Sequence, residues 1–470
     1  MSSPVTTPER GTGRFGGPWT TFGVCATATY IGSLDFSIVN VAFIEIERAF
    51  TGASRASVSW VVTAYAILYG SLLVVSGRAA DRIGRKRVFG FGVRMFLLGS
   101  VVCALAPTIV VLVAGRVVQG AGAAMLTPSA LGMMISAFPV ERRNQMVSWN
   151  TAISALGVAS GPTLGAVLIG VLDWRAAFWV NIPICLAVLV LVRRVDAPAP
   201  TERGALPDVP AAVFVTFAVG ALVWGIAETE VVGIADVRVW GALLVASGLG
   251  AVVVHRTRTR PEPLLPRVMF AHRSMNLANV AMILFGGAFS GNILNNVLFM
   301  RTEWEFGIVR AGLFSVLSPV TVAITSFLVG RNVRRLGLRN LLIVGSGLFM
   351  VCQLSFLTVI TETPHPWTRW LPLMLLLGVA IGCVAPALAA SAVQHAPPAQ
   401  VALAGALNST ARQIGAALGV AVLVAVQAMS TGIGSYRAGW ITMAVFAATS
   451  GAISLLQPRP AAPAVGTVGA

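Results

Sequence analysis

The sequence predicts an all-α integral membrane protein of about fourteen membrane-spanning helices, arranged as two six-helix bundles plus two inserted helices. Hydrophobic residues make up 56% of the chain and charged residues only 11%, whereas soluble domains contain roughly 25% charged residues. The apolar residues come in repeated runs of about twenty, the length of helix that crosses a bilayer. Short basic clusters separate these runs on alternate loops.

The apolar runs can be followed in order between loops that are too short to form a separate soluble domain. We expect spans near 19–44, 57–76, 88–107, 110–137, 145–171, 176–194, 209–228, 237–254, 275–300, 309–330, 340–360, 370–394, 402–429 and 437–456. The longest breaks, 195–208 and 255–274, flank the seventh and eighth spans. We therefore divide the chain into an amino-terminal six-helix bundle (1–194), a linker with two additional helices (195–274) and a carboxy-terminal six-helix bundle (275–470).

The distribution of positive charge predicts the orientation, because cytoplasmic loops carry an excess of arginine and lysine. With the amino terminus in the cytoplasm, 22 Arg and Lys residues fall on cytoplasmic segments and eight on the opposite loops. An even number of spans then places both termini in the cytoplasm of a multi-pass cell-membrane protein. The first apolar run is too long for the core of a cleaved signal peptide. The net charge of +16 lies in these short loop clusters, a distribution that argues against nucleic-acid binding.

A short internal repeat supports the division into two halves. The pattern Gly77-Arg78-x-x-Asp81-Arg82-x-Gly84 recurs, with arginine in place of the acid, as Gly330-Arg331-x-x-Arg334-Arg335-x-Gly337, displaced by 253 residues. A Gly/Arg match of this length can arise by chance in cytoplasmic loops. Both copies join the second and third spans of their half, however, and duplication of a six-helix unit explains that placement better.

Asp35 is the only carboxylate that we expect deep within a span. An ionisable side chain at that depth is costly, so it normally faces a cavity and a functional role is the default hypothesis. Burial favours the neutral form of a carboxyl group, which allows a buried acid to bind and release a proton at physiological pH. A structural acid, paired with a buried arginine or a hydroxyl, is the alternative interpretation.

Three arginines, Arg94, Arg116 and Arg412, are also expected within spans. Arg116 lies among small residues that allow helices to approach closely, and its guanidinium would help a protonated Asp35 to release its proton if the two side chains meet. Arg94 is expected to extend toward the cytoplasmic surface. Arg412, next to Gln413, is compatible with either a pocket role or a structural role.

A glycine-rich segment lies in the middle of the fifth span and contains Gly157, Gly161, Pro162 and Gly165. Glycines four residues apart form a face on which helices pack closely, and the proline removes one hydrogen bond and bends the helix. Two interpretations remain open: ordinary helix packing, and a bend that shapes a cavity and hinders leakage.

The loop Gly77–Arg87 turns sharply between two spans and contains one acid, Asp81, among five cationic residues. The acid is expected to form ion pairs or to face the positive end of a neighbouring helix. We interpret Gly77, Asp81, Arg82 and Arg85 as a gate. A plain positively charged cytoplasmic loop is the alternative.

Aromatic, amide and basic side chains within the apolar spans are candidates for a substrate pocket. Amides in spans seek partners or line water, whereas aromatic residues at such spacing more often pack against neighbours or lipid. The candidates are Tyr30, Phe36, Trp60, Tyr65, Asn150, Asn292, Asn295, Asn296, Asn408, Arg412 and Gln413. The sequence contains no zinc spacing, phosphate-binding loop or nucleophile motif, so we expect no metal, no cofactor and no enzymatic activity.

Six of these segments together resemble the drug:proton antiporters of the major facilitator superfamily, of the fourteen-helix EmrB/QacA-like type. The segment Leu34–Ala42 resembles the first-helix signature, Trp60–Tyr65 the second-helix signature and Gly77–Arg87 the loop motif shared across the superfamily. Three more segments resemble the fourth-helix motif associated with proton coupling, the fifth-helix antiporter motif and the entry to the sixth helix; these are Gly115–Gly122, Gly157–Gly165 and Trp174–Pro183. Individually weak, the matches occur in order and at matching positions in the topology.

The resemblance implies the major facilitator fold and alternating access, in which two bundles rock around a central cavity. It implies that Asp35 is the proton-linked acid, Arg116 its coupling partner and Asp81 part of the cytoplasmic gate. The proton motive force would drive export of small amphipathic drugs or antibiotics, and we expect a monomer. Proton-coupled symport of a small organic metabolite into the cell is the alternative, which the resemblance to the antiporter motif disfavours.

Two departures from the family pattern are visible. Ala166 follows Gly165, where the antiporter motif commonly has a second glycine. The ninth span carries asparagines in a region where some relatives that export divalent cations carry an acid, so divalent cations are not expected as substrates.

Overall fold

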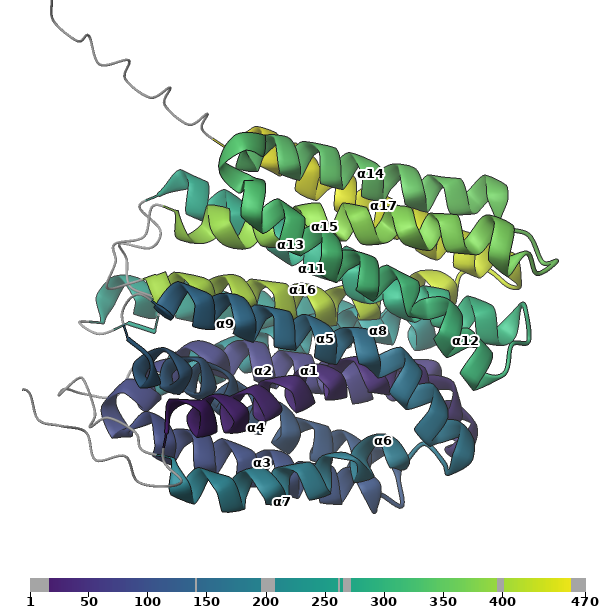
Figure 1. The fold of residues 1–470 in the computed structure, drawn as a ribbon. Helices are drawn as coiled ribbons and strands as arrows, with labels where there is room; N and C mark the ends of the chain where they lie inside the picture. Colours follow the sequence, from purple (N-terminus) through teal and green to yellow (C-terminus); the bar gives the residue numbers. More distant parts are fainter. Residues whose placement is uncertain are drawn as a thin grey trace, which may run out of the picture.

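The computed structural model describes residues 17–139, 142–195, 208–260, 263–264, 272–394 and 401–457, and all regular secondary structure in these ranges is helical. Within them, 14 helical spans are long and apolar enough to cross a membrane, which confirms the predicted all-α membrane fold. The polar segment before the first span, and much of the two long breaks around the inserted pair, fall outside the described residues. Figure 1 shows the helices lying side by side, the amino-terminal bundle below and the carboxy-terminal bundle above.

Six spans form the amino-terminal bundle. They are α1 (Pro18–Ala49), α2 (Arg55–Ile83), α3 (Arg85–Ala104), α4 (Ile109–Ala137), α5 (Arg143–Val171) and a sixth span built from α6 (Ala176–Trp179), α7 (Asn181–Leu191) and the turn η2 (Val192–Arg194). Side-chain caps satisfy the first backbone amides of several helices, because an amide without a partner at a helix start is costly. Ser54 caps α2 and Thr108 caps α4 in this way.

The inserted pair and the carboxy-terminal bundle complete the chain. The inserted helices are α8 (Val209–Val232) and α9 (Val237–Thr259). The second bundle contains α11 (Arg273–Thr302), α12 (Ile308–Ser315) with α13 (Leu317–Leu336), α14 (Leu338–Val359), η3 (Pro366–Trp370) with α15 (Leu371–Val393), α16 (Val401–Gln427) and α17 (Ile433–Leu455). We name the face at which α1 begins and α17 ends the terminal face, and the opposite face, which holds the turn between α1 and α2, the distal face.

The two copies of the internal repeat share a backbone feature. Gly84 has a φ of 111° between α2 and α3, and Gly337 has a φ of 76° between α13 and α14. Only glycine adopts such positive φ values without a steric penalty. Each copy thus makes the same tight turn between the second and third spans of its half, while the side chains of Arg334 and Arg335 lie outside what the structure describes.

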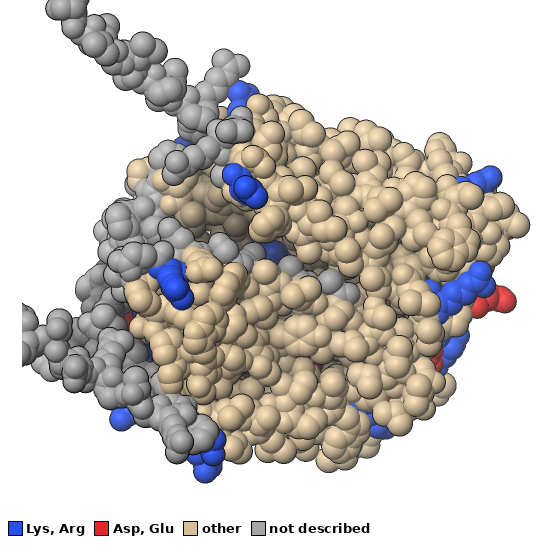
Figure 2. All heavy atoms as spheres, in the orientation of Figure 1, with Lys and Arg blue, Asp and Glu red and all other residues tan. Residues whose placement is uncertain are grey.

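The lateral surface of the molecule is apolar. In Figure 2 the Lys, Arg, Asp and Glu side chains of the visible face lie mostly toward its two ends, and other residues cover most of the area between them. Large hydrophobic side chains such as Phe217, Leu244 and Phe327 are exposed on this surface. Soluble proteins rarely expose so much apolar area to water. On a membrane-spanning helix, such side chains face the lipid instead.

The inserted helices cover one seam between the bundles. Helix α8 packs against both α2 and α16, and α9 packs mainly on α8. Ala66, Ala417 and Ala421 form a small buried cluster at this seam together with Val223 of α8. The pair therefore lies at the side of the molecule, against one helix of each bundle.

On the opposite side the bundles are in contact near the distal face. Helix α5 contacts α12 and α13, and Gly170, near the distal end of α5, lies against Ile308 and Val309 at the start of α12. Figure 2 shows the surface hollowed between the two bundles toward the left of the view, where α1 begins and α17 ends in Figure 1. The hollow therefore lies toward the terminal face, and the bundles are in contact near the distal face.

An ion pair at the terminal face ties the two inserted helices together. Asp208 caps α8, and Arg256 near the end of α9 donates to both of its carboxylate oxygens at 2.6 and 2.9 Å. The hydrogen bonds from Arg256 hold the pKa of Asp208 below its ordinary value of 3.8. A carboxyl group with a lowered folded-state pKa contributes stability that is present above the unfolded-state pKa and is lost as the pH falls through the folded-state pKa.

We predict that Asp208→Asn lowers the melting temperature of the detergent-solubilised protein at pH 7 by at most about 2 °C, because Arg256 is partly exposed and asparagine can also cap α8. The deficit relative to wild type should stay constant from pH 8 to pH 5 and shrink only as the pH falls below 3.8. Thermal unfolding followed by tryptophan fluorescence measures this. A deficit that disappears between pH 8 and pH 6 would contradict the assignment to Asp208.

Candidate functional site

A buried ion pair lies at the centre of the amino-terminal bundle. Arg116 on α4 donates from Nη1 to the Oδ2 atom of Asp35 on α1 over 2.6 Å. The side chains of Asp35 and Arg116 are 0% and 1% exposed, so neither charge reaches water in this conformation. The two residues expected to meet for proton coupling are therefore in direct contact.

Two amides complete the polar shell of Asp35. Gln119, one turn after Arg116, donates to Asp35 Oδ1 over 3.1 Å and accepts from Arg116 over 2.7 Å. Asn181, at the start of α7, donates to the same carboxylate oxygen over 2.8 Å. An ionised carboxylate is acceptor-only, and it satisfies all three donors. The Oδ1 atom of Asn181 is buried without a partner, which leaves one free acceptor beside Asp35.

Arg116 is enclosed on its other sides as well. Its Nε atom donates to the backbone oxygen of Val61 over 2.8 Å, and its guanidinium lies 4.3 Å from the ring centroid of Tyr65, within cation–π range. Tyr65 is itself buried, and its hydroxyl lies 3.4 Å from the backbone oxygen of Gly32. Tyr65 thus covers the ion pair on the side of α2, the helix that contacts the carboxy-terminal bundle.

Glycines allow the helices around this pair to approach closely. A Cβ atom on Gly99 of α3 would lie 2.6 Å from the backbone nitrogen of Gln119, and one on Gly115 of α4 would lie 2.6 Å from the Sγ atom of Cys103. Both distances are shorter than real Cβ contacts allow. The small residues next to Arg116 in the sequence therefore place Gln119 and Ser100 within hydrogen-bonding distance of each other, at 2.8 Å.

The glycines of the fifth span face α1. A Cβ atom on Gly157 would lie 2.6 Å from the backbone oxygen of Tyr30, and one on Gly161 would lie 2.5 Å from the side chain of Ser37. Gly165 faces Ile38 in the same way. The same interface contains a hydrogen bond of 2.8 Å between Tyr30 and Ser160. The repeated glycines let α5 lie directly against the helix that carries Asp35.

The neighbouring face of α5 contacts the other bundle. Gly312 on α12 would place a Cβ atom 2.5 Å from the Cβ atom of Ala166 and 2.6 Å from the backbone oxygen of Pro162. The α5 residue at this contact is an alanine, and the close approach is made possible by the glycine on α12. Helix α5 therefore packs between α1 of its own bundle and α12 of the other.

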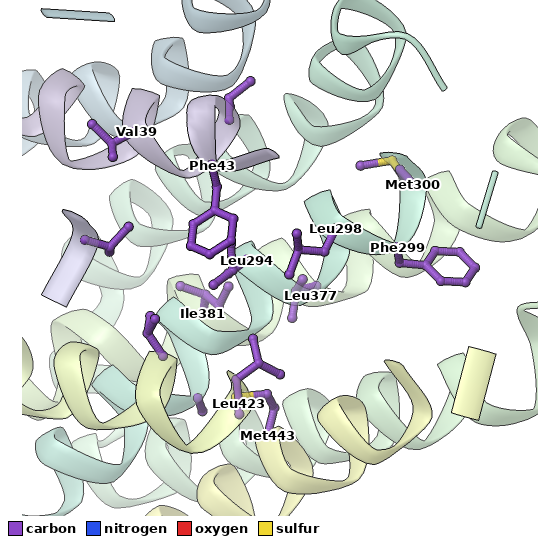
Figure 3. Packing of buried hydrophobic residues seen from close by; sticks show 14 of the residues in the cluster. Val39, Phe43, Leu294, Leu298, Phe299, Met300, Leu377, Ile381, Leu423 and Met443 are labelled. Atoms are coloured by element: carbon purple, nitrogen blue, oxygen red, sulfur yellow. The ribbon is translucent and has the colours of Figure 1, made fainter. Parts of the chain in front are cut away.

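Apolar side chains and an ion pair close the distal half of the space between the bundles. Phe43 on α1 points toward Leu294 on α11, and Leu298 lies one turn further along α11 (Figure 3). Beyond them, Arg301 at the end of α11 forms an ion pair with Glu45 on α1. Since Phe43 and Glu45 belong to the same helix as Asp35, the distal seal and the buried acid move with one rigid element.

The loop residues interpreted as a gate lie at the terminal face. Asp81 pairs with Arg85 over 2.9 Å, and Arg85 also donates to the backbone oxygen of Gly132 on α4 over 2.7 Å. Gly77 lies beside Pro128 of α4, and Arg82 lies in the last turn of α2. The contacts of Asp81 and Arg85 therefore join helices of the same bundle. The role of the loop residues as a gate remains a prediction.

The pocket candidates of the amino-terminal bundle lie at several places. Tyr30 and Asn150 both lie at the interface of α1 and α5, where Thr29 donates to Asn150 over 3.0 Å. Phe36 is buried in the bundle core together with Tyr65. Trp60 packs at the seam with α8, away from the α5–α1 interface.

The three asparagines of the ninth span lie inside the carboxy-terminal bundle. Asn292 accepts from Gln353 on α14 over 2.7 Å, Asn295 accepts from Gln427 on α16 over 2.7 Å, and Asn296 accepts from Trp440 on α17 over 2.9 Å. Their amides thus connect helices of the bundle with each other, and a contact with substrate remains a prediction for them.

The remaining candidates lie on α16, which faces the amino-terminal bundle. Asn408 donates to Asn279 on α11 over 3.1 Å. Gln413 packs against Gly70 of α2, and its Oε1 atom is buried without a partner. Arg412 is half-buried.

Gln119 and Asn181 were not predicted as site residues, although both belong to segments that resemble family motifs. A signal was present, because an amide within an apolar span needs a partner. The direction in which the side chains of Gln119 and Asn181 point could not be predicted. The apolar runs around them lack the amphipathic pattern that shows which face of a helix is buried.

Comparisons with known proteins agree with this fold. The model of the Major Facilitator Superfamily matches residues 25–420 and 280–469. The methylenomycin A resistance protein of Streptomyces coelicolor is 30% identical over 85% of this chain and 83% of its own length. The cephamycin export protein of Amycolatopsis lactamdurans is 31% identical over 87% of this chain and 85% of its own. A solved peptide transporter has the same fold, with a TM-score of 0.69 at 16% identity over 96% of both chains.

We predict that Gly161→Ala destabilises the protein and reduces its transport activity, because the added methyl group meets Ser37 and pushes α5 away from α1. Gly23→Ala on α1 is the matched control, since nothing lies within 4 Å of the added group and alanine is favoured over glycine in a helix by about 1 kcal/mol. Thermal unfolding of both purified variants measures the difference. Equal stability of the two variants would contradict the packing role of Gly161.

Proposed function

Because this chain belongs to the Major Facilitator Superfamily and is therefore a membrane transporter, we propose that it is a proton-coupled antiporter that exports small amphipathic drugs or antibiotics by alternating access. The observation that carries the coupling mechanism is the fully buried pair of Asp35 and Arg116 beside the space between the bundles. The names of the relatives, which describe resistance and export of antibiotics, support the direction of transport.

The shell of Asp35 supports two protonation states. With the carboxylate ionised, Arg116, Gln119 and Asn181 all donate to it. A protonated carboxyl group needs an acceptor, and the free Oδ1 atom of Asn181 would supply one if the side-chain amide turned over about χ2. Protonation also removes the charge that compensates Arg116, so the ion pair weakens and α1 is released from α4. A proton therefore changes the packing of α1 rather than a surface charge.

Helix α1 connects that change to the distal face. In the conformation described here the hollow lies toward the terminal face, and Phe43 and Glu45 of α1 close the distal side against α11. Movement of α1 relative to α4 while the substrate is bound and Asp35 is ionised would open this contact. A proton from the distal side would then bind Asp35, and the substrate would leave on that side. Because α5 is packed on both α1 and α12, the two bundles would move as units and no leak would open along this interface.

We place the terminal face on the cytoplasmic side of the cell membrane. The basic loops lie at this face, and cytoplasmic loops are enriched in Arg and Lys. The proton motive force, with no cofactor, then drives substrate from the hollow to the outside. One chain supplies both bundles and the space between them, which supports a monomer as the working unit.

We predict that Asp35→Asn abolishes proton-driven uptake into inverted membrane vesicles of compounds to which the wild-type chain confers resistance. The loss should reach at least tenfold, about the accumulation that one pH unit supplies. Removing one partner of a buried ion pair costs about 3–5 kcal/mol, so a variant that fails to fold would give the same result. The double variant Asp35→Asn with Arg116→Gln removes both charges and serves as the folding control.

The double variant should reach wild-type expression and melting temperature and remain inactive. Uptake by a well-folded double variant at the wild-type rate would remove Asp35 from the coupling mechanism. Vesicles of opposite orientation distinguish export from import: compounds driven into right-side-out vesicles by an inward proton gradient would instead indicate symport.

A further inference from the structure

Arg412 is a half-buried cation on α16, and no described residue supplies it with a counter-ion. Arg412 is positioned 11 residues into α16, about 16 Å of helix from its start, which is too deep for its guanidinium to reach the terminal face. In the described part of the chain it takes part in no hydrogen bond or ion pair. An uncompensated charge at such depth is costly and marks a functional position by default.

The neighbours of Arg412 on α16 define the direction in which it points. Gly415 and Gly419 lie against the backbone of α11, while Thr410 donates to the backbone oxygen of Gly70 on α2 over 2.7 Å. Arg412 lies on the face between these two contacts. One turn further along that face, Ala416 packs into the core cluster of the amino-terminal bundle that contains Tyr65. The exposed part of Arg412 therefore opens into the space between the bundles and away from lipid.

Arg412 lies near the aromatic side chain that covers the ion pair. Ala416, one turn beyond Arg412, belongs to the same buried cluster as Tyr65, whose ring lies over the Arg116 guanidinium. Half-buried Tyr69, with its ring centroid 5.9 Å from that of Tyr65, and Phe289 of α11, which packs against the cores of both bundles, supply apolar surface in the same region. The site thus combines one free cation with aromatic walls.

We propose that Arg412 is the anion-binding group of the substrate path, and that the substrates include amphipathic carboxylates. Asp35 is already compensated by Arg116, so the free charge in this region is positive and favours an anionic ligand. A guanidinium binds a planar carboxylate through two parallel hydrogen bonds, while the aromatic side chains contact the apolar body. This inference rests on the proposed export function and names the substrate class of the same site.

Exchange of a proton for an anion has a consequence for the driving force. One proton entering and one monovalent anion leaving move two positive charges inward in each cycle, so the membrane potential acts twice. A neutral analogue of the same substrate moves only one. Export of the acid should therefore depend more steeply on membrane potential than export of its ester.

Binding of dansyl-phenylalanine and of its methyl ester tests the proposal, because the two probes differ only in the carboxylate. The purified full-length protein is placed in phosphatidylcholine nanodiscs, so no anionic lipid competes for Arg412. Wild type should bind the acid at least about tenfold more tightly than the ester, as expected for hydrogen bonds to charged groups. Arg412→Gln should abolish that preference and leave ester affinity unchanged, and Arg412→Lys should retain part of it.

Arg94→Gln is the matched control, since it removes an exposed arginine from the span α3 and should leave the preference for the acid intact. Equal affinity of wild type for acid and ester, including binding of neither, would overturn the proposal, as would a preference that survives in Arg412→Gln. Transport of the ester distinguishes failure of the Arg412 proposal from failure of the proposed export function. Arg412→Gln should still transport the ester, whereas Asp35→Asn should transport neither probe.

Discussion

The ion pair between Asp35 and Arg116 is the interaction on which the amino-terminal bundle depends. Two charges without access to water are stable only if every remaining donor and acceptor around them is satisfied. That requirement brings together α1, α3, α4 and α7, whose side chains supply the carboxylate, the hydroxyl of Ser100, the guanidinium and amide of α4, and the amide of Asn181. The carboxy-terminal bundle has a polar network on corresponding spans: Asn292 and Asn296 lie on its first span, Gln353 on its third, and the indole of Trp440 on its sixth. That network is neutral, so the buried charge pair belongs to one half of the molecule.

Helix α1 transmits the state of this pair to the rest of the protein. It carries Asp35 near its middle, Phe43 and Glu45 near its distal end, and the surface on which the glycines of α5 pack. Helix α5 in turn contacts α12 through Ala166 and Gly312. Because closely packed interfaces have discrete arrangements rather than continuous ones, a change at Asp35 that shifts α1 moves the bundles as units.

The number and order of the spans could be predicted from the sequence, since bilayer thickness imposes a length that apolar runs must meet. The tight turns at Gly84 and Gly337 were also foreseeable from the repeat. The contacts of single side chains could not be predicted from the sequence. Nothing in the sequence shows that Arg116 meets Asp35, or that Gln119 and Asn181 join them, because a helix that is apolar all round does not reveal its rotation. The same limit separates Asn296, which bonds within its bundle, from Arg412, which does not. Both are polar residues in apolar runs, and only packing distinguishes a core position from one that faces the space between the bundles.

The central claim is that export is coupled to proton exchange at Asp35, and proton release on substrate binding tests it most directly. Purified protein in weakly buffered detergent solution near neutral pH, mixed with a saturating exported compound, should release about one proton per chain, detected with a pH-sensitive dye. The double variant Asp35→Asn with Arg116→Gln should bind the compound and release none. Proton release by that variant equal to wild type, or substrate binding by wild type without any release, would contradict the account.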